Sequence, residues 1–453
     1  MLFLGRQTQR TCQTTHRRAF LQIGASSVLG LSLAGRLKAG GEQSIGSAKS
    51  VVLLWLWGGP SQLDTFDPKP NAPLDYRGPF GTIPTRTPGI RFCELFPKLA
   101  NNSNRFSVIR SLHTQSNDHG VAGTIGLTGS AAGGTGLDGK PLAGTPQPAM
   151  GSVVARANAK AGGSSGLPPF LVVGGKLHQG KKMIVGEGGG KLGSMYDPFR
   201  LVYDPAEGTK VPALQLPEEL TPERLTDRMT LQSAFDQSQR KLDNIALDDY
   251  RRRAFDMLSS PQSREAFDLS KENEQTVRRY GKTRFGQSCL LARRLVETGV
   301  PFVQVNWSDH VEAEEASGDG GWDHHYRNFQ IMQDRHAAWL DQSVSAFLTD
   351  LDERGLLKTT LVIAVGEFGR TPKINDKAGR EHHPDCYSAL VAGGGVVGGR
   401  VIGTSDARAE KPADTPLTPA DLCATVHRSI GLTSEQITGM GLVPSGRVIE
   451  ELF

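Results

Sequence analysis

Residues 361–384, LVIAVGEFGRTPKINDKAGREHHP, constrain the fold most strongly, because an apolar run leads directly into a dense set of polar side chains. The five apolar residues 361–365 indicate a strand that is buried on both faces. Gly366 ends the run and places Glu367 at the carboxyl end of the strand, where open α/β sheets bind ligands. The following loop contains Arg370 and ends in Arg380, Glu381, His382 and His383. These groups together suit a divalent metal and an anion; the alternative is a surface loop with ordinary charges.

A second cluster, GWDHHY at residues 321–326, follows a predicted strand at 302–305. It sets Asp323 beside His324 and His325, which is compact metal-ligand chemistry. This short motif is only moderately specific by itself, and its combination with Glu367 and His382 strengthens the prediction of a metal site. The helix predicted at 329–351 carries His336, which we interpret as a packing or surface histidine.

Two further apolar runs end in polar loops. The strand predicted at 51–57 leads to Asp64, a candidate metal ligand, and to Asp67, for which turn chemistry before Pro68 is the better interpretation. The strand predicted at 106–112 leads to residues 113–120, HTQSNDHG. There His119 is a candidate ligand or general acid; the alternative is a histidine that caps the following small-residue segment. Residues 120–126 form a helix or a loop, and we expect the Gly/Ala/Ser/Thr-rich stretch 120–166 to be mainly loop.

The order of predicted strands and helices favours an α/β fold with a buried, mostly parallel sheet. Additional strands are expected at 170–173 and 388–392, and additional helices at 283–297 and 420–430. Charge-dense, helix-periodic residues at about 217–280 predict a helical insertion. The chain is 38% hydrophobic and 22% charged with a net charge of +4. This composition is typical of a globular protein, and the charge does not indicate nucleic-acid binding. The five cysteines have no metal-finger spacing, and a disulfide between two of the last four stays open.

Residues 1–46 have the features of a targeting segment. The sequence HRRAFL at residues 16–21 and the weakly apolar run at 23–34 resemble a twin-arginine export signal. The run is too short and too rich in Gly and Ser for a spanning helix. We therefore expect an exported protein, periplasmic or extracellular, whose mature domain covers residues 47–453 and has no membrane partner after the signal is removed.

Four motifs in this order, WLWGGPSQLDTFDPKP, GWDHH, GEFGRTP and GREHHP, resemble the bacterial domain-of-unknown-function family 1501. That family is similar in fold to the alkaline phosphatase and sulfatase superfamily, an α/β/α sandwich with metals at the carboxyl edge of the sheet. The resemblance implies metal ligands at Asp64, Asp323, His325 or His324, Glu367, and His382 or His383. It places a nucleophile near Ser116 or Thr114. Phe368 stands where the superfamily has a histidine, and no sulfatase-type Cys-x-Pro-x-Arg occurs.

The leading hypothesis from the sequence is a metal-dependent hydrolase of phosphate or sulfate esters that holds two cations. Zinc suits the histidines, whereas calcium, magnesium or manganese suit a more oxygen-rich set. Arg370 is a candidate for holding an anionic oxygen of a small-molecule or polysaccharide ester. The alternative hypothesis is a catalytically reduced relative that binds polysaccharide or protein. The sequence does not indicate an oligomeric state.

Overall fold

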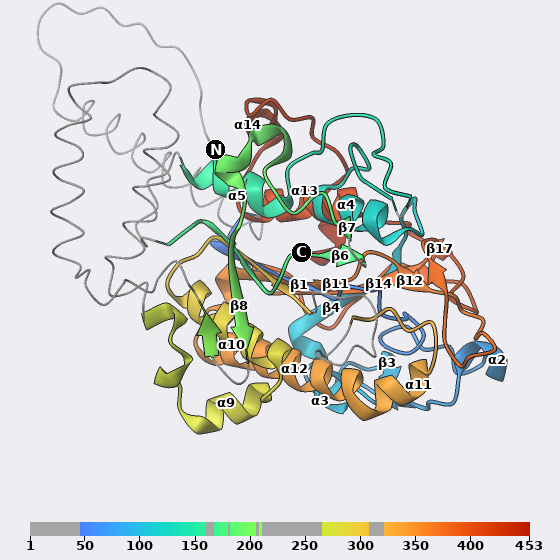
Figure 1. The fold of residues 1–453 in the computed structure, drawn as a ribbon. Helices are drawn as coiled ribbons and strands as arrows, with labels where there is room; N and C mark the ends of the chain where they lie inside the picture. The colour runs from blue at the N-terminus through green and yellow to red at the C-terminus, as the bar shows by residue number, and fades with distance from the viewer. Residues whose placement is uncertain are drawn as a thin grey trace, which may run out of the picture. The chain divides into compact units, whose positions relative to one another are not determined.

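A nine-stranded sheet lies at the centre of the fold, with the order β15-β4-β14-β11-β1-β10-β5-β8-β9 (Figure 1). The strands are β1 (Ser50–Trp55), β4 (Phe106–Leu112), β5 (Phe170–Val173), β8 (Phe199–Asp204), β9 (Gly208–Lys210), β10 (Phe302–Asn306), β11 (Thr360–Val365), β14 (Tyr387–Ala392) and β15 (Val401–Ile402). β1 pairs in parallel with β10 and β11, whereas β14 is antiparallel to its neighbours β4 and β11. β9 is antiparallel to β8. The predicted α/β fold with a mostly parallel central sheet is confirmed.

The computed structural model describes residues 46–136, 138–159, 167–179, 182–204, 208–210, 265–307 and 321–453. Residues 45–453 form one compact unit. Most of the predicted helical insertion lies outside the described residues, as does the leader. The described end of the insertion contains α9 (Glu274–Tyr280).

Helices cover both faces of the sheet (Figure 1). They are α3 (Pro97–Asn101), α10 (Arg284–Glu297) and α12 (Ala337–Glu353) on one side, and α4 (His119–Thr128), α5 (Met150–Ala159), α13 (Pro419–Ser429) and α14 (Ser434–Thr438) on the other. Because successive side chains of a strand point to opposite faces, β1 contributes to both cores. Val52 and Leu54 join the core under α10 and α12, whereas Val51, Leu53 and Trp55 join the core under α5 and α13. The buried apolar area on the two faces holds the sheet between its helical layers.

The structure differs from the predicted elements in two details. Residues 120–166, expected to be mainly loop, contain two helices: most of α4, which begins at His119, and all of α5. α4 forms although it is rich in glycine, since Asp118 accepts a hydrogen bond from the Val121 N–H and caps its start. The helix predicted at 329–351 is divided into α11 (Asn328–Ile331), a π-helical turn (Met332–His336) and α12.

Short two-stranded antiparallel hairpins lie outside the central sheet. They are β2 (Thr82–Pro84) with β3 (Arg91–Cys93), β6 (His178–Gln179) with β7 (Lys182–Met183), β12 (Gly369–Arg370) with β13 (His382–His383), and β16 (Thr404–Ser405) with β17 (Pro412–Asp414). A short helix, α2 (Leu74–Arg77), precedes the first hairpin. Of these, the β12–β13 hairpin matters most, because it fixes two side chains of the site described below.

Glycines let α4 lie directly on the sheet, and this close approach yields a stability prediction. A Cβ atom at Gly126 would come within 2.4 Å of the Trp55 ring. Because Trp55 is fully buried, Gly126→Leu should lower the free energy of unfolding by about 3 kcal/mol or more through overpacking. Val121→Ala, at a half-exposed position of the same helix, should cost far less. Urea unfolding of the two variants measures the difference, and equal losses would contradict the packing argument.

Candidate metal centre

Four connecting segments meet at the edge of the sheet where β1, β4, β10 and β11 end. β14 runs in the opposite direction, so the residues before it, including β13, lie at the same edge. In an α/β sheet the chain leaves the strands at this edge and is free to present polar side chains. The structure gathers His119 from the start of α4, Asp323 and His325 from the segment after β10, and His382 from β13.

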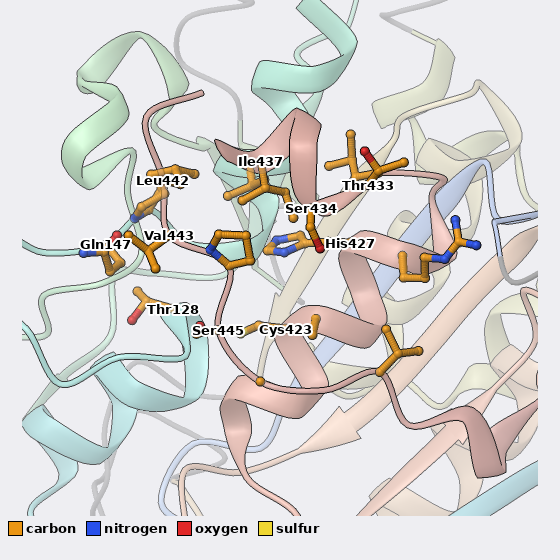
Figure 2. Close-up of a pocket in the computed structure, with 18 of the residues that line it drawn as sticks. Thr128, Gln147, Cys423, His427, Thr433, Ser434, Ile437, Leu442, Val443 and Ser445 are labelled. Carbon is orange, nitrogen blue, oxygen red and sulfur yellow. The ribbon is translucent and has the colours of Figure 1, made fainter. Parts of the chain in front are cut away.

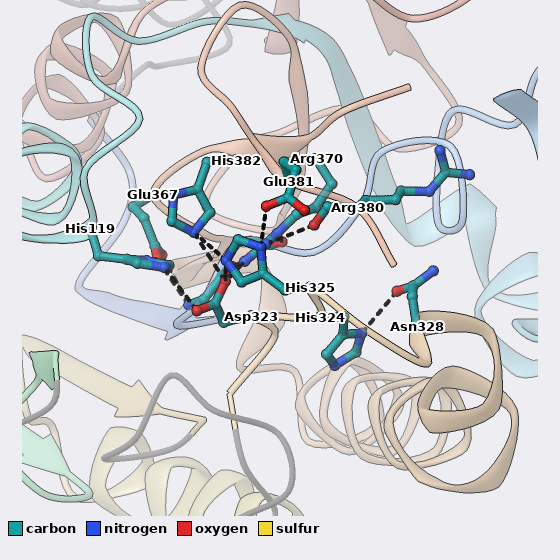
Figure 3. Close-up of polar contacts among 12 residues, drawn as sticks. His119, Asp323, His324, His325, Asn328, Glu367, Arg370, Arg380, Glu381 and His382 are labelled. Carbon is teal, nitrogen blue, oxygen red and sulfur yellow. Dashed lines mark hydrogen bonds and ion pairs between the residues drawn. The ribbon is translucent and has the colours of Figure 1, made fainter. Parts of the chain in front are cut away.

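Three imidazole rings surround the carboxylate of Asp323 (Figure 3). Asp323 Oδ1 lies 3.0 Å from His325 Nε2 and 3.1 Å from His382 Nε2, and Asp323 Oδ2 lies 3.3 Å from His119 Nε2. One ligand atom each from His119, Asp323 and His382 lie within 4.8 Å of one another. His325 joins this group from one side, with its Nε2 3.0 Å from His382 Nε2. We refer to His119, Asp323, His325 and His382 as the histidine–aspartate cluster.

The outer nitrogen of each ring is held by an acceptor. His119 Nδ1 lies 2.6 Å from Glu367 Oε1, and His382 Nδ1 donates to the Asn117 carbonyl oxygen at 2.7 Å. His325 Nδ1 is hydrogen-bonded to the Glu381 carboxylate. Metal-binding histidines usually donate their second ring N–H to such a carboxylate or carbonyl. A neutral ring whose Nδ1–H is committed in this way has its lone pair on Nε2, and all three Nε2 atoms face Asp323.

A cation fits this donor set better than hydrogen bonding among the side chains alone. With both Nδ1 atoms protonated, the facing Nε2 atoms of His325 and His382 are two acceptors 3.0 Å apart. His119 Nε2 is buried and makes no well-formed hydrogen bond, although Asp323 Oδ2 lies 3.3 Å away. Such an orphaned buried nitrogen is costly unless a proton or a metal satisfies it. Imidazole nitrogens with one carboxylate form a donor set typical of zinc.

Burial and neighbouring charges act in opposite directions on the pKa values of the histidine–aspartate cluster. Burial by itself would raise the pKa of Asp323, but Arg370 and the three histidines lower it well below its usual range. Burial by itself would lower the pKa of His119, but the neighbouring carboxylates of Asp323 and Glu367 raise it; Asp323 also raises the pKa of His325. The pKa of His382 is lowered, chiefly by burial. Asp323 thus stays ionised, and protons compete with any divalent cation for the imidazoles around it.

Arg370 and Phe368 form the inner wall of the site. Arg370 contacts Asp323 and the Gly58 carbonyl, and it donates to the Gly59 carbonyl at 3.0 Å. This buried guanidinium holds Asp323 in place. Phe368 packs beside the rings of His119 and His382, with centroid distances of 4.8 and 4.7 Å. An aromatic ring therefore occupies the position where the resemblance called for another histidine.

Asp64 lies outside the histidine–aspartate cluster in an ion pair with Arg380. Arg380 Nε and Nη2 donate to its two carboxylate oxygens at 2.7 and 3.0 Å. The Asn328 side-chain amide donates to Asp64 as well, at 2.9 Å. Both charged side chains are buried. The structure thus gives Asp64 a buried cation of the protein itself as its partner.

Two of the predicted histidines point away from the cluster. His324 is buried, with Nδ1 2.9 Å from the Asn328 side-chain oxygen and Nε2 2.8 Å from His336 Nδ1. In the β12–β13 hairpin His382 is opposite Arg370 and His383 is opposite Gly369, so successive side chains alternate between faces. His383 accordingly lies on the other side, with its Nε2 2.7 Å from the Glu410 carbonyl oxygen.

The two candidate nucleophiles lie on the loop before α4. The Ser116 hydroxyl accepts a hydrogen bond of 3.1 Å from the Asp118 N–H, whereas the Thr114 hydroxyl is buried without a hydrogen-bond partner. Neither hydroxyl is bonded to a member of the histidine–aspartate cluster. Their predicted role stays a prediction.

Three supporting groups were not among the predicted ligands. They are the Asn117 carbonyl, the Gly58 N–H, which donates to Glu367 at 2.9 Å, and the Glu381 carboxylate. The two backbone groups carry no sequence signal. Glu381 had one, because it is next to His382 in the GREHHP motif.

A separate cavity of about 430 Å³ lies at the other end of α4 (Figure 2). It is lined by Thr128, the last residue of that helix, and by residues of α13, α14 and the segment 442–448. His427 projects among its lining side chains, and His427 Nε2 is buried without a hydrogen-bond partner. The cavity contains no gathering of carboxylates and imidazoles comparable to the histidine–aspartate cluster in the part of the chain described. We therefore place the chemistry at the sheet edge.

Burial lowers the pKa of His427 to about 4, from an ordinary value near 6.5. A histidine with a depressed folded-state pKa is protonated more readily in the unfolded chain. Stability is therefore unaffected by this group above pH 6.5 and falls by up to about 3 kcal/mol as the pH drops toward 4. His427→Phe should flatten this part of the pH–stability curve in urea titrations, and an unchanged slope would contradict the assignment.

All four cysteines after Cys12, namely Cys93, Cys289, Cys386 and Cys423, are buried free thiols. The disulfide that the sequence left open is therefore not formed among them. Within the described residues no helix is both long and apolar enough to cross a membrane.

The fold and the site together define an α/β protein with a candidate metal centre at the carboxyl edge of its sheet. The chain belongs to the family described as "Protein of unknown function (DUF1501)", whose model matches residues 48–453. No curated protein matches the sequence.

Several solved structures are similar to the chain. The PsFucS1 sulfatase from Pseudoalteromonas sp. is 13% identical, with 88% of this chain and 70% of that chain covered and a TM-score of 0.41. The phosphonate monoester hydrolase of Agrobacterium radiobacter is 11% identical, with coverage of 89% and 77% and a TM-score of 0.33. A magnesium-bound variant of TAB5 alkaline phosphatase is 10% identical, with coverage of 86% and 99% and a TM-score of 0.34.

Proposed function

We propose that this protein is an exported, metal-dependent hydrolase of phosphate or sulfate esters. The observation that carries the proposal is the common orientation of three buried or half-buried imidazoles. Each ring has Nδ1 fixed by an acceptor and Nε2 directed at Asp323. Export rests on the twin-arginine-like leader, and the substrate is a small-molecule or polysaccharide ester.

The charge balance of the centre supports one divalent cation rather than the two expected from the sequence. With neutral imidazoles, the carboxylates of Asp323, Glu367 and Glu381 and the guanidinium of Arg370 give a net charge of −2. One divalent ion neutralises this charge, and a second would leave an uncompensated excess. Asp64, which the sequence assigned to the metal set, is already neutralised by Arg380.

The ligands we propose are His119, Asp323 and His382, with His325 as the fourth. The nitrogen-rich set suits zinc better than calcium, magnesium or manganese. A bound divalent cation would polarise an ester and lower the pKa of a water molecule in the site. The protein's own groups orient the imidazoles through Glu367, Glu381 and the Asn117 carbonyl, and Arg370 keeps Asp323 ionised and in place.

One observation favours a second candidate function. Ser116 and Thr114 are not bonded to the histidine–aspartate cluster, so the described residues show no side-chain nucleophile in place beside it. This is compatible with a binding module for polysaccharide or protein, in which one structural metal holds the loops together. Such a protein would bind metal and have no turnover.

A panel of aryl phosphates and sulfates, supplied with zinc, separates the two functions. We expect release of 4-nitrophenol from at least one ester, abolished by removing zinc with a chelator and restored by adding it back. Metal binding without turnover of any ester would contradict the hydrolase and support the binding module.

A further inference from the structure

We infer that Asn375 is a positioning residue of the metal centre, which fixes the ring of His325 by holding the carboxylate of Glu381. This inference rests on the metal centre of the proposed function and goes beyond its ligands and their direct acceptors. It follows from how the acceptor of each imidazole is itself held in place.

The acceptors of the three ring Nδ1 atoms differ in how firmly the fold holds them. The Asn117 carbonyl is a backbone group, and the fully buried carboxylate of Glu367 accepts a further hydrogen bond of 2.9 Å from the Gly58 N–H. The side chain of Glu381, which is the acceptor for His325, is 54% exposed. An exposed ion pair gains little over solvent and restricts two side chains. We therefore expect Glu381 to need a second contact that holds its carboxylate in one position.

Asn375 supplies this second contact. Its side-chain Nδ2 donates to Glu381 Oε1 at 2.7 Å, while Glu381 Oε2 is bonded to His325 Nδ1. The same Nδ2 donates to the His325 carbonyl oxygen at 2.8 Å. A primary amide has two N–H donors, and both are used here. One side chain thus joins the carboxylate that orients the His325 ring to the backbone of His325 itself.

The orientation of the Asn375 amide is fixed by the turn that follows it. Its Oδ1 accepts hydrogen bonds from the N–H groups of Lys377 and Gly379, at 3.0 and 2.8 Å. Because a backbone N–H can only donate, the amide oxygen must face the turn. The amide nitrogen must then face Glu381 and the His325 carbonyl. The amide is therefore satisfied on both sides and has a single favourable orientation.

The turn also packs closely on the segment that carries His325. A Cβ atom at Gly379 would come within 2.0 Å of the His325 carbonyl oxygen. Arg327 in one segment and Ala378 in the other have positive φ angles, of 50° and 54°. Such angles are costly for residues other than glycine and persist where the surrounding contacts enforce them. The two segments are thus held in one arrangement, and the Asn375 amide is part of the contact between them.

Zinc affinity in a double-mutant cycle tests the inference. Asn375→Ala should weaken zinc binding by roughly tenfold, the lower end of the cost of losing a group that supports a metal ligand. Competition with a chromophoric chelator measures this loss. In a Glu381→Ala background the same change should cost less than about threefold, because no carboxylate is left to be held. Asn375→Ser retains a side-chain oxygen that can accept from the turn, and it should show the same dependence on Glu381.

Asn273→Ala is the matched control. Asn273 caps α9 by accepting a hydrogen bond of 2.8 Å from the Thr276 N–H, so its loss removes another asparagine that fixes the local backbone. This variant should unfold at a lower urea concentration than the unmodified protein and keep its zinc affinity. The comparison separates a general loss of stability from an effect on the metal centre.

The possible outcomes distinguish this inference from the hydrolase. An unchanged zinc affinity in Asn375→Ala and Asn375→Ser, or equal losses with and without Glu381, would overturn the inference. No zinc binding by the unmodified protein would contradict the metal centre and this inference with it. Zinc binding with the expected dependence on Glu381, but without turnover of any ester, would count against the hydrolase and support the role of Asn375.

Discussion

His382→Gln is expected to weaken binding of zinc by more than about a hundredfold. Loss of a residue that only supports a metal ligand typically costs 10- to 100-fold in affinity, and removal of a ligand itself should cost more. His382 Nε2 lies 3.1 Å from Asp323 Oδ1 and 3.0 Å from His325 Nε2, in the middle of the proposed donor set. Competition with a chromophoric chelator measures the dissociation constant, and hydrolysis of the best ester should fall with the metal content.

The adjacent histidine provides a matched control. His383→Gln changes the same residue type in the same short strand, but His383 Nε2 contacts the Glu410 carbonyl on the other face of the hairpin. Its zinc affinity should stay within a few-fold of the unmodified protein. Asp323→Ala is a less clean test, because it also leaves buried Arg370 without its carboxylate and destabilises the fold. Equal zinc affinities for the two histidine variants would remove His382 from the centre.

Arg380→Met is expected to lower the free energy of unfolding by about 3–5 kcal/mol. The variant leaves the buried carboxylate of Asp64 without its two guanidinium hydrogen bonds, and breaking one side of a buried ion pair has this cost. The change should appear in urea or thermal unfolding of the metal-free protein, in which metal binding contributes nothing.

Arg408→Met provides the comparison for a surface arginine. Arg408 is half-exposed and its ion pair with Glu410 is long, at 4.0 Å, so the loss should be below about 1 kcal/mol. Adding Asp64→Asn to Arg380→Met should recover part of the lost stability, because the unpaired charge is removed. A loss for Arg380→Met no larger than that for Arg408→Met would contradict a structural role for the pair.

Continuous apolar runs were sufficient to predict most of the sheet. The apolar runs at 51–57, 106–112, 170–173, 302–305 and 361–365 all correspond to strands, because strands buried on both faces have continuous apolar sequences. α4 was left open between a helix and a loop, because its small residues have little hydrophobic periodicity. α5 was missed as a helix within a stretch rich in small residues. In α4 the glycines serve close packing on Trp55 and Trp57, a requirement that is visible only once the helix lies on the sheet.

The motifs were enough to predict which loops meet at the site. They did not predict which side chains of each loop point into it. Asp323, His325 and His382 meet, whereas His324 and His383, their immediate neighbours, point away. For His383 the reason is that successive residues of β13 alternate in direction. Asp64 is paired with Arg380, which is 316 positions later in the chain, and no local pattern indicates such a partner. The acceptors that fix the imidazoles are partly backbone groups, which every residue has.

The metal content of the folded protein tests the central claim most directly. Elemental analysis after loading with zinc and removal of excess metal should find about one equivalent per chain in the unmodified protein and in His383→Gln. It should find almost none in His382→Gln. Two equivalents would contradict the charge balance of the centre, and none in the unmodified protein would show that Asp323 and its three histidines hold protons instead of a metal.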